Sequence, residues 1–300
     1  MFLSLILPFI YAATLPVGGI SSIEVQAKEA TITVQANTAG FYRWASNNNS
    51  DWEVEEKDGR LYFTALADDA KNLQIVGPSR NLKIINKKGK VSISKWQAAL
   101  AVKGLDLDVL AKDIQGDISV YSHRGQIRVE DTVGNLDLHL GKTDTVIERL
   151  KGKLDLNQFS GNLRIQDYDG EANVKNQKAK VELKDSQGRF VYSSLRGDFL
   201  VNNYSGSLRG NSGSGMNILR PAPNAKVYWR AEQGGLRLGV KKISGAYVDI
   251  ATKEGALFLV PPLRAKNEGI WRVARAKLQG SPSASVRIRT EKADVRVKYE

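Results

Sequence analysis

The stretch GKLDLNQFSGNLRIQDYDG, residues 152–170, decides the fold. Gly152 and Gly161 each open a nine-residue unit, and apolar side chains follow two and four positions later, as Leu154 and Leu156 follow Gly152. The residues between them are mostly polar, and this alternation with a period of two is typical of a half-buried strand. Glycine favours a turn because its backbone adopts positive φ at little cost. Each unit is therefore predicted to form one short strand and one turn.

The same unit recurs far beyond this stretch. Glycines follow one another at intervals of one or two units: Gly116, Gly125, Gly134, Gly152, Gly161, Gly170, Gly188, Gly197, Gly206 and Gly215. The two skipped positions hold Thr143 and Ala179. A fixed period is the signature of stacked repeats. We therefore expect an all-β repeat architecture, a β-solenoid or a coiled β-sandwich-like fold, in which one coil takes two or three nine-residue units.

The N-terminal residues MFLSLILPFIYAA, 1–13, form an apolar run that is too short to span a bilayer. Such a run followed by small residues is typical of a secretory signal peptide, which we assign to residues 1–16. Cleavage is expected near Ala12 or Ala13. Cleavage after Ala27 and an uncleaved anchor are the alternatives, although the former would cut a predicted strand. We expect export to the periplasm, the outer surface or the medium.

Residues 17–300 are predicted to form a single elongated β-repeat domain, with N-terminal hairpins at 17–71, the repeat array at 72–262, and an insertion with closing strands at 263–300. One hairpin is expected over Ser22–Ala36, and a second is expected over 52–63 around an Asp-Gly turn. The segment Lys95–Val102 interrupts the rhythm and fits either a short helical turn or an apolar strand.

The later part of the array also departs from the rule. Gly210 occupies a position where the repeat calls for an apolar core residue, so we expect a loose turn or bulge there. Phe258 and Val260 are expected to form the last apolar pair of the array.

The chain is basic, with a formal net charge of +12, and the excess is uneven. Residues 226–300 contain sixteen Lys and Arg against seven Asp and Glu, a net charge of +9. Such an asymmetry suggests an anionic partner, although a solvated surface gives the same composition. The chain has no cysteine, which excludes disulfides, thiolate metal sites and cysteine nucleophiles.

Metal and cofactor chemistry is poorly supported. His123 and His139 are the only histidines, and neither belongs to an HExxH motif. A calcium-binding nonapeptide roll needs an oxygen ligand at the same place in every turn, and Lys153, Lys180 and Arg189 break that series. We predict no metal, no cofactor and no catalytic residue.

A carbohydrate-active β-helix is the enzymatic alternative. Such an enzyme needs two carboxylates on one face beside an open groove. Asp137 and Asp155 are the first candidates, because each stands three residues after the glycine that opens its unit and could project from the same sheet face, and Asp167 and Asp169 flank Tyr168 at a turn. Acidic residues scattered over an exposed sheet are equally expected at this composition, so we favour a protein without enzymatic activity.

The basic C-terminal part gives the main binding hypothesis. Alternation would place Arg287, Arg289, Arg296 and Lys298 on one exposed face. Guanidinium and ammonium groups there suit the phosphates or carboxylates of an envelope glycan or lipid, or an envelope protein. Nucleic acid is not expected, because no binding module supports it. The candidate binding residues are Trp271, Arg272, Arg275, Lys277, Arg287, Arg289, Arg296 and Lys298.

Val191 and Leu200 break the rule that outward positions are polar. A strand that is apolar on both sides is typical of burial on both faces, here under the C-terminal segment, and we favour that interpretation. The alternative is an exposed patch that binds a partner.

The chain resembles DUF4097, a bacterial family of putative adhesin domains, over about residues 20–300. The resemblance lies in the opening IEVQAKEATITVQ (23–35), in tandem units such as GNLRIQDYD (161–169) and GDFLVNNYS (197–205), and in the closing SVRIRTEKADVRVKY (285–299). It implies an exported envelope or surface interaction module and brings no catalytic residues. A self-associating structural envelope protein is a further alternative, since unprotected terminal strands can pair.

Overall fold

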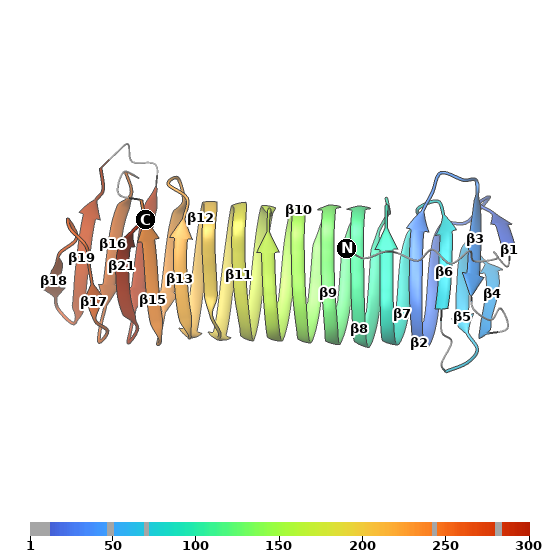
Figure 1. Ribbon diagram of the computed structural model, residues 1–300, viewed down its shortest axis with the longest axis horizontal. Coiled ribbons are helices and arrows are strands. Elements are labelled where there is room, and N and C mark those ends of the chain that lie inside the picture. The colour runs from blue at the N-terminus through green and yellow to red at the C-terminus, as the bar shows by residue number, and fades with distance from the viewer. Residues whose placement is uncertain (1–12, 47–50, 69–71, 242–244, 280–283) are drawn as a thin grey trace. The chain divides into compact units, whose positions relative to one another are not determined.

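The computed structural model describes residues 13–46, 51–68, 72–241, 245–279 and 284–300, and every element that it assigns is a β-strand (Figure 1). The chain divides into two compact units, residues 1–134 and 135–300. The strands of the first unit are β1 (Ala13–Pro16), β2 (Ser22–Ala36), β3 (Phe41–Ser46), β4 (Trp52–Lys57), β5 (Arg60–Ala65), β6 (Asn72–Gly77), β7 (Asn81–Ser94), β8 (Leu100–Gln115) and β9 (Ile118–Val133). No described helix is long and apolar enough to cross a membrane.

The second unit contains the remaining strands. They are β10 (Leu136–Gln166), β11 (Asp169–Arg196), β12 (Phe199–Ser214), β13 (Met216–Pro221), β14 (Lys226–Ala231), β15 (Gly235–Val240), β16 (Tyr247–Thr252), β17 (Leu257–Phe258), β18 (Ala265–Glu268), β19 (Trp271–Lys277), β20 (Ser285–Thr290) and β21 (Asp294–Tyr299). The boundary between the units falls inside the array that the sequence presents as continuous.

Strand register fixes the size of one coil. In the first unit Leu82 pairs with Leu100 and Leu100 pairs with Ile118, always in parallel. In the second unit Val181 pairs with Phe199 in the same way. Each partner stands two nine-residue units further along the chain, so one coil contains two units. The predicted all-β, solenoid-like repeat architecture is confirmed, and of the two coil sizes that the sequence allows the shorter is correct.

The two turns of each coil differ. All ten repeat glycines have positive φ, for example 155° at Gly170 and 113° at Gly188. A Cβ at Gly170 would overlap the backbone oxygen of Gly152 in the preceding coil, so only glycine fits. Every second turn also begins with a left-handed residue, and these recur once per coil: Lys95, Asp113, Asp131, Arg149, Asp167, Asp185 and Asn203. Asp and Asn tolerate that conformation better than other side chains do.

The segment that interrupts the repeat in the first unit is a wide corner. Trp96 is fully buried there, and its indole nitrogen donates a hydrogen bond to the carbonyl oxygen of Arg80 at 2.9 Å. Strand β8 then begins at Leu100 in the normal register. A large aromatic ring therefore fills the corner where other coils place a short turn.

The loose turn or bulge expected at Gly210 is wrong, because Gly210 lies within β12 in unbroken register, and an aromatic stack explains its missing side chain. The ring of Phe199 lies 4.2 Å from that of Tyr192 and 4.8 Å from that of Trp229, measured between centroids. Gly210 pairs with Trp229 across β12 and β14, and a Cβ at Gly210 would overlap the indole. The indole thus supplies the apolar volume that the glycine lacks. From this point the coil is one position longer, because Ser207 pairs with Lys226.

Each unit also contains antiparallel strand pairs. In the first unit β4 and β5 form the expected hairpin around Asp58 and Gly59. The hairpin expected over Ser22–Ala36 is wrong, because β2 pairs in parallel with β5, β6 and β7 and its two halves are successive strands of one coil. In the second unit β18 and β19 form an antiparallel pair that docks on β16.

Most of the proposed signal peptide, residues 1–12, lies outside the described residues. Its last residues form β1, which pairs antiparallel with β3.

Candidate binding surfaces of the C-terminal coils

Parallel register in the second unit aligns outward side chains from successive strands into two rows. We call the first the Asp249 row: Asp155, Asn173, Val191, Arg209, Tyr228, Arg287, Asp249 and Arg275. The second is the Phe258 row: Arg164, Glu182, Leu200, Ile218, Arg237, Arg296 and Phe258. Residues far apart in sequence thus become direct neighbours.

Three arginines in and beside the first row converge on one buried carboxylate. The side chain of Asp249 is only 6% exposed, and its Oδ2 lies 2.6 Å from Nη2 of Arg289. Nε of Arg275 lies 3.3 Å from Oδ1, and Nε of Arg287 lies 3.5 Å from Oδ2. Burial by itself would raise the pKa of Asp249, but the Arg289 hydrogen bond and the three guanidinium charges outweigh it and lower the pKa. These arginines therefore join β19 and β20 to β16.

A second carboxylate strengthens the same cluster. Nη1 and Nη2 of Arg275 donate to the two carboxylate oxygens of Glu268 at 2.8 and 3.1 Å, which links β18 to β19. Three of the seven predicted binding cations, Arg275, Arg287 and Arg289, are therefore already engaged by acidic groups of the chain itself.

The other predicted residues of β19 form none of the ion pairs around Asp249. Trp271 is half-buried and stacks with Lys253, whose Nζ lies 5.2 Å from the ring centre. It lines a cavity of about 240 Å³ in which Glu291 pairs with Arg230 at 3.3 Å and with Lys253 at 3.5 Å. Arg272 and Lys277 are exposed near opposite ends of β19.

The prediction that Arg287, Arg289, Arg296 and Lys298 share one face is wrong. Strand β20 pairs with β14 and β16, whereas β21 pairs with β15 and β17. These strands are the two halves of one coil, so the turn between Thr290 and Asp294 carries the chain from one ladder to the other. Arg296 and Lys298 are therefore exposed on a different ladder from Arg287 and Arg289.

Val191 and Leu200 are separated for the same reason, since they lie one unit apart on successive strands. Val191 belongs to the Asp249 row beside Arg209, and Leu200 belongs to the Phe258 row between Glu182 and Ile218. Each side chain is half-buried. They form neither one shared patch nor a strand that is fully buried on both faces.

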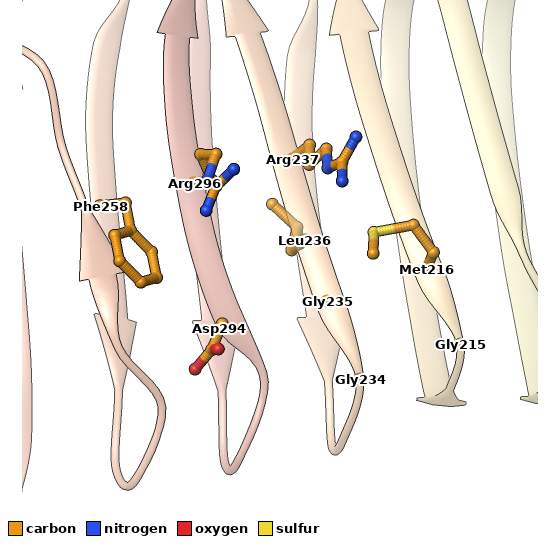
Figure 2. A pocket seen from close by; sticks show the side chains of 9 residues that line it. All are labelled: Gly215, Met216, Gly234, Gly235, Leu236, Arg237, Phe258, Asp294 and Arg296. Carbon is orange, nitrogen blue, oxygen red and sulfur yellow. The ribbon is translucent and has the colours of Figure 1, made fainter.

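The C-terminal end of the Phe258 row borders a cavity of about 470 Å³ (Figure 2). Arg237 and Arg296 are direct partners in the parallel register, and both are exposed. The guanidinium carbon of Arg296 lies 5.0 Å from the ring centre of Phe258. Among the residues that the structure describes, no carboxylate forms an ion pair with either arginine.

Gly235 lines this cavity, and the end of the Met216 side chain occupies the space that a side chain at Gly235 would take. A Cβ there would lie 2.7 Å from the methyl carbon of Met216, whose side chain lies along one wall (Figure 2). Asp294 lines the cavity from the strand that carries Arg296, and its Oδ1 accepts a hydrogen bond from the amide of Ala256 at 2.8 Å.

The acidic pair considered for glycoside hydrolysis lies on the outer face of β10. Oδ1 of Asp137 lies 3.2 Å from Nε2 of His139, and Oδ1 of Asp155 accepts a hydrogen bond from Asn173 at 3.5 Å. Tyr168, between Asp167 and Asp169, is buried, and its hydroxyl donates to the carbonyl oxygen of Gly152. Among the described residues, no cluster of three metal-ligating side chains is found.

Sequence reasoning missed three features of this cavity: Arg237, Met216 and the outward side of Phe258. Alternation predicts an inward Phe258, yet its side chain is 47% exposed, because in β17 it pairs with Arg296, which lies on the outward side of β21. Arg237 and Arg296 stand in similar Leu-Arg-Leu and Val-Arg-Val contexts, which is the one signal that could have linked them. Their distance along the chain hides the pairing, because β16 to β20 intervene.

Comparison with models of protein families finds no match, and neither does comparison with curated proteins. Two solved structures are similar to the chain. One, described as a "putative cell adhesion protein" from Clostridium sporogenes, is 12% identical, with 95% of this chain and 96% of that chain covered and a TM-score of 0.21. The other, described as a "putative adhesin" from Bacteroides fragilis, is 13% identical, with 96% and 95% covered and a TM-score of 0.26. With TM-scores this low, the fold is established by the chain's own strand register.

Proposed function

We propose that this protein is an exported, non-enzymatic interaction module of the cell envelope or cell surface, and that it binds an anionic envelope polymer through the cations of the Phe258 row. One observation carries this proposal. Arg237 and Arg296 stand side by side over an open cavity and form no ion pair with a described carboxylate. The comparable arginines of the Asp249 row are instead paired within the fold.

Electrostatics supports an anionic partner. Neighbouring strands lie about 4.8 Å apart, and like charges directly opposite one another destabilise a sheet. Lys298, exposed two residues after Arg296, adds a third cation on the same side of β21. An anion bound between these groups would relieve their repulsion and gain charge-assisted hydrogen bonds.

The two alternative functions have less support. Asp137 and Asp155 contact His139 and Asn173 on the sheet surface, and no described cavity contains both carboxylates. Self-association through the terminal strand is disfavoured because β18 exposes Lys266 and Glu268 along its edge, and charged residues on an edge oppose strand pairing.

The test is co-sedimentation of the purified protein with isolated cell envelopes at low and high salt. We expect binding that high salt abolishes and that the double variant Arg237→Gln/Arg296→Gln loses. The matched control is Lys153→Gln/Lys175→Gln, which removes the same charge from exposed positions of the same unit. Equal losses of envelope binding in both variants would show that binding depends only on the net charge of the protein. Binding unchanged by salt and by the arginine variant would refute the proposal.

A further inference from the structure

The cavity beside the Phe258 row has two chemically different ends. Arg237 and Arg296 provide guanidinium groups at one end (Figure 2). Asp294 lies two residues before Arg296 on the same side of β21, which is about 7 Å along a strand. Its Oδ1 accepts the Ala256 amide, so Oδ2 is the oxygen that is left to accept from a ligand. The site therefore offers hydrogen-bond donors at one end and an acceptor at the other.

Apolar groups lie on both sides of the line that joins Asp294 to the two guanidinium groups. Phe258 presents a ring that is 47% exposed, and the flexible side chain of Met216 lies opposite, above the backbone of Gly235 (Figure 2). A cavity of about 470 Å³ with apolar sides and few polar groups has the general character of a small-ligand site.

We propose that this cavity binds a carboxylated sugar, a uronic acid residue of an acidic polysaccharide. The inference rests on the proposed function and specifies its ligand. The sugar carboxylate lies between Arg237 and Arg296, because the planar guanidinium group matches a carboxylate with two parallel hydrogen bonds. A hydroxyl group of the same sugar donates to Asp294, and the apolar face of the ring packs on Phe258.

The arrangement discriminates against other polymers. A neutral sugar leaves both guanidinium groups without a counter-charge. A polyphosphate chain has no hydroxyl donor for Asp294 and brings negative charge towards that carboxylate. A molecule that carries a carboxylate and hydroxyl groups on one ring satisfies both ends of the cavity at once.

The experiment is calorimetric titration of the full chain at low salt with three probes: oligogalacturonate, a neutral oligogalactose of equal length, and inorganic polyphosphate. Gly235→Leu adds side-chain volume to the lining of the cavity without changing any charge, and the atoms within 4 Å of a Cβ at Gly235 all belong to the flexible end of Met216. Asp294→Asn keeps an oxygen for the Ala256 amide while replacing the free acceptor with a donor. Circular dichroism and thermal melting establish that each variant is folded.

We expect oligogalacturonate to bind at least tenfold more tightly than either other probe, Gly235→Leu to weaken that binding about tenfold, and Asp294→Asn to remove most of the preference over polyphosphate. If all anionic probes bind equally and folded Gly235→Leu leaves binding unchanged, the uronate site is refuted while the proposed function stands. If no anionic probe and no envelope preparation binds, both are refuted.

Discussion

The two outward rows of the C-terminal coils have the same architecture, but the arginines near the closing strands are paired with a carboxylate in only one of them. Each row contains an arginine from one of the closing strands, Arg287 on β20 or Arg296 on β21. In one row β16 contributes Asp249, and three guanidinium groups close around it. In the other row β17 contributes Phe258, which stacks with Arg296 and leaves the charge uncompensated. One residue on the strand next to the arginines therefore decides whether they stabilise the fold or face a cavity.

Among these tests, we expect the largest effect from removing the carboxylate of Asp249, on which the arginines of the first row converge. We expect Asp249→Ala to lower the free energy of unfolding by about 3 kcal/mol, because it leaves three guanidinium groups around an uncharged buried site. Chemical denaturation measures the change. Asp294→Ala, which removes an exposed carboxylate from the other row's cavity, is the control and should cost about 1 kcal/mol or less. Equal effects of the two substitutions would contradict the structural role assigned to Asp249.

The pH dependence of stability tests whether the ionised carboxylate of Asp249 stabilises the fold. The folded-state pKa of Asp249 is lowered, so its contribution is fully present above the unfolded-state value of about 3.9 and is lost as the pH falls through the folded-state value. The difference in stability between the wild type and Asp249→Asn should therefore be constant from pH 7 to about pH 5 and shrink below about pH 4. Denaturation curves across this range test it, and a difference that disappears near pH 6 would be inconsistent with a lowered pKa.

Giving the second row a carboxylate of its own should reduce anion binding. Phe258→Asp places an acidic group next to Arg296, so we expect affinity for isolated envelopes or an anionic polymer to fall about tenfold, which corresponds to about 1.4 kcal/mol. Phe258→Asn is the matched control for loss of the ring without added charge. If both variants bind equally weakly, the aromatic ring matters more than the charge balance.

The smallest expected effect separates Leu200 from Val191. Leu200→Asp adds negative charge to the Phe258 row, two strands away from Arg237, and should weaken anion binding about twofold to threefold by screened repulsion. Val191→Asp makes the same change in the Asp249 row and should leave binding unchanged. Binding assays at low salt on folded variants distinguish them, and equal weakening would show that the two rows do not act separately.

Particular residues show why sequence reasoning succeeded for the fold and only partly for the surface. The spacing from Gly152 to Gly170 predicts strands and turns because both depend on local backbone geometry. The left-handed turn residues at Asp167, Asp185 and Asn203 also recur once per coil, and this signal would have fixed the coil size. Arg287 and Arg296 appear equivalent in sequence, since each alternates with apolar neighbours, yet they lie on different ladders.

The sequence by itself determined that this protein is an all-β repeat, where the glycine turns of its repeat array fall, and that its C-terminal part carries excess positive charge. These properties follow from the alternation of side chains and from glycine, which act over a few residues. Only the tertiary structure decided which cations are neutralised. Arg289 and Asp249, and likewise Arg237 and Arg296, are far apart in the chain. They are brought together by the pairing of distant strands, which cannot be inferred from a pattern of neighbouring residues.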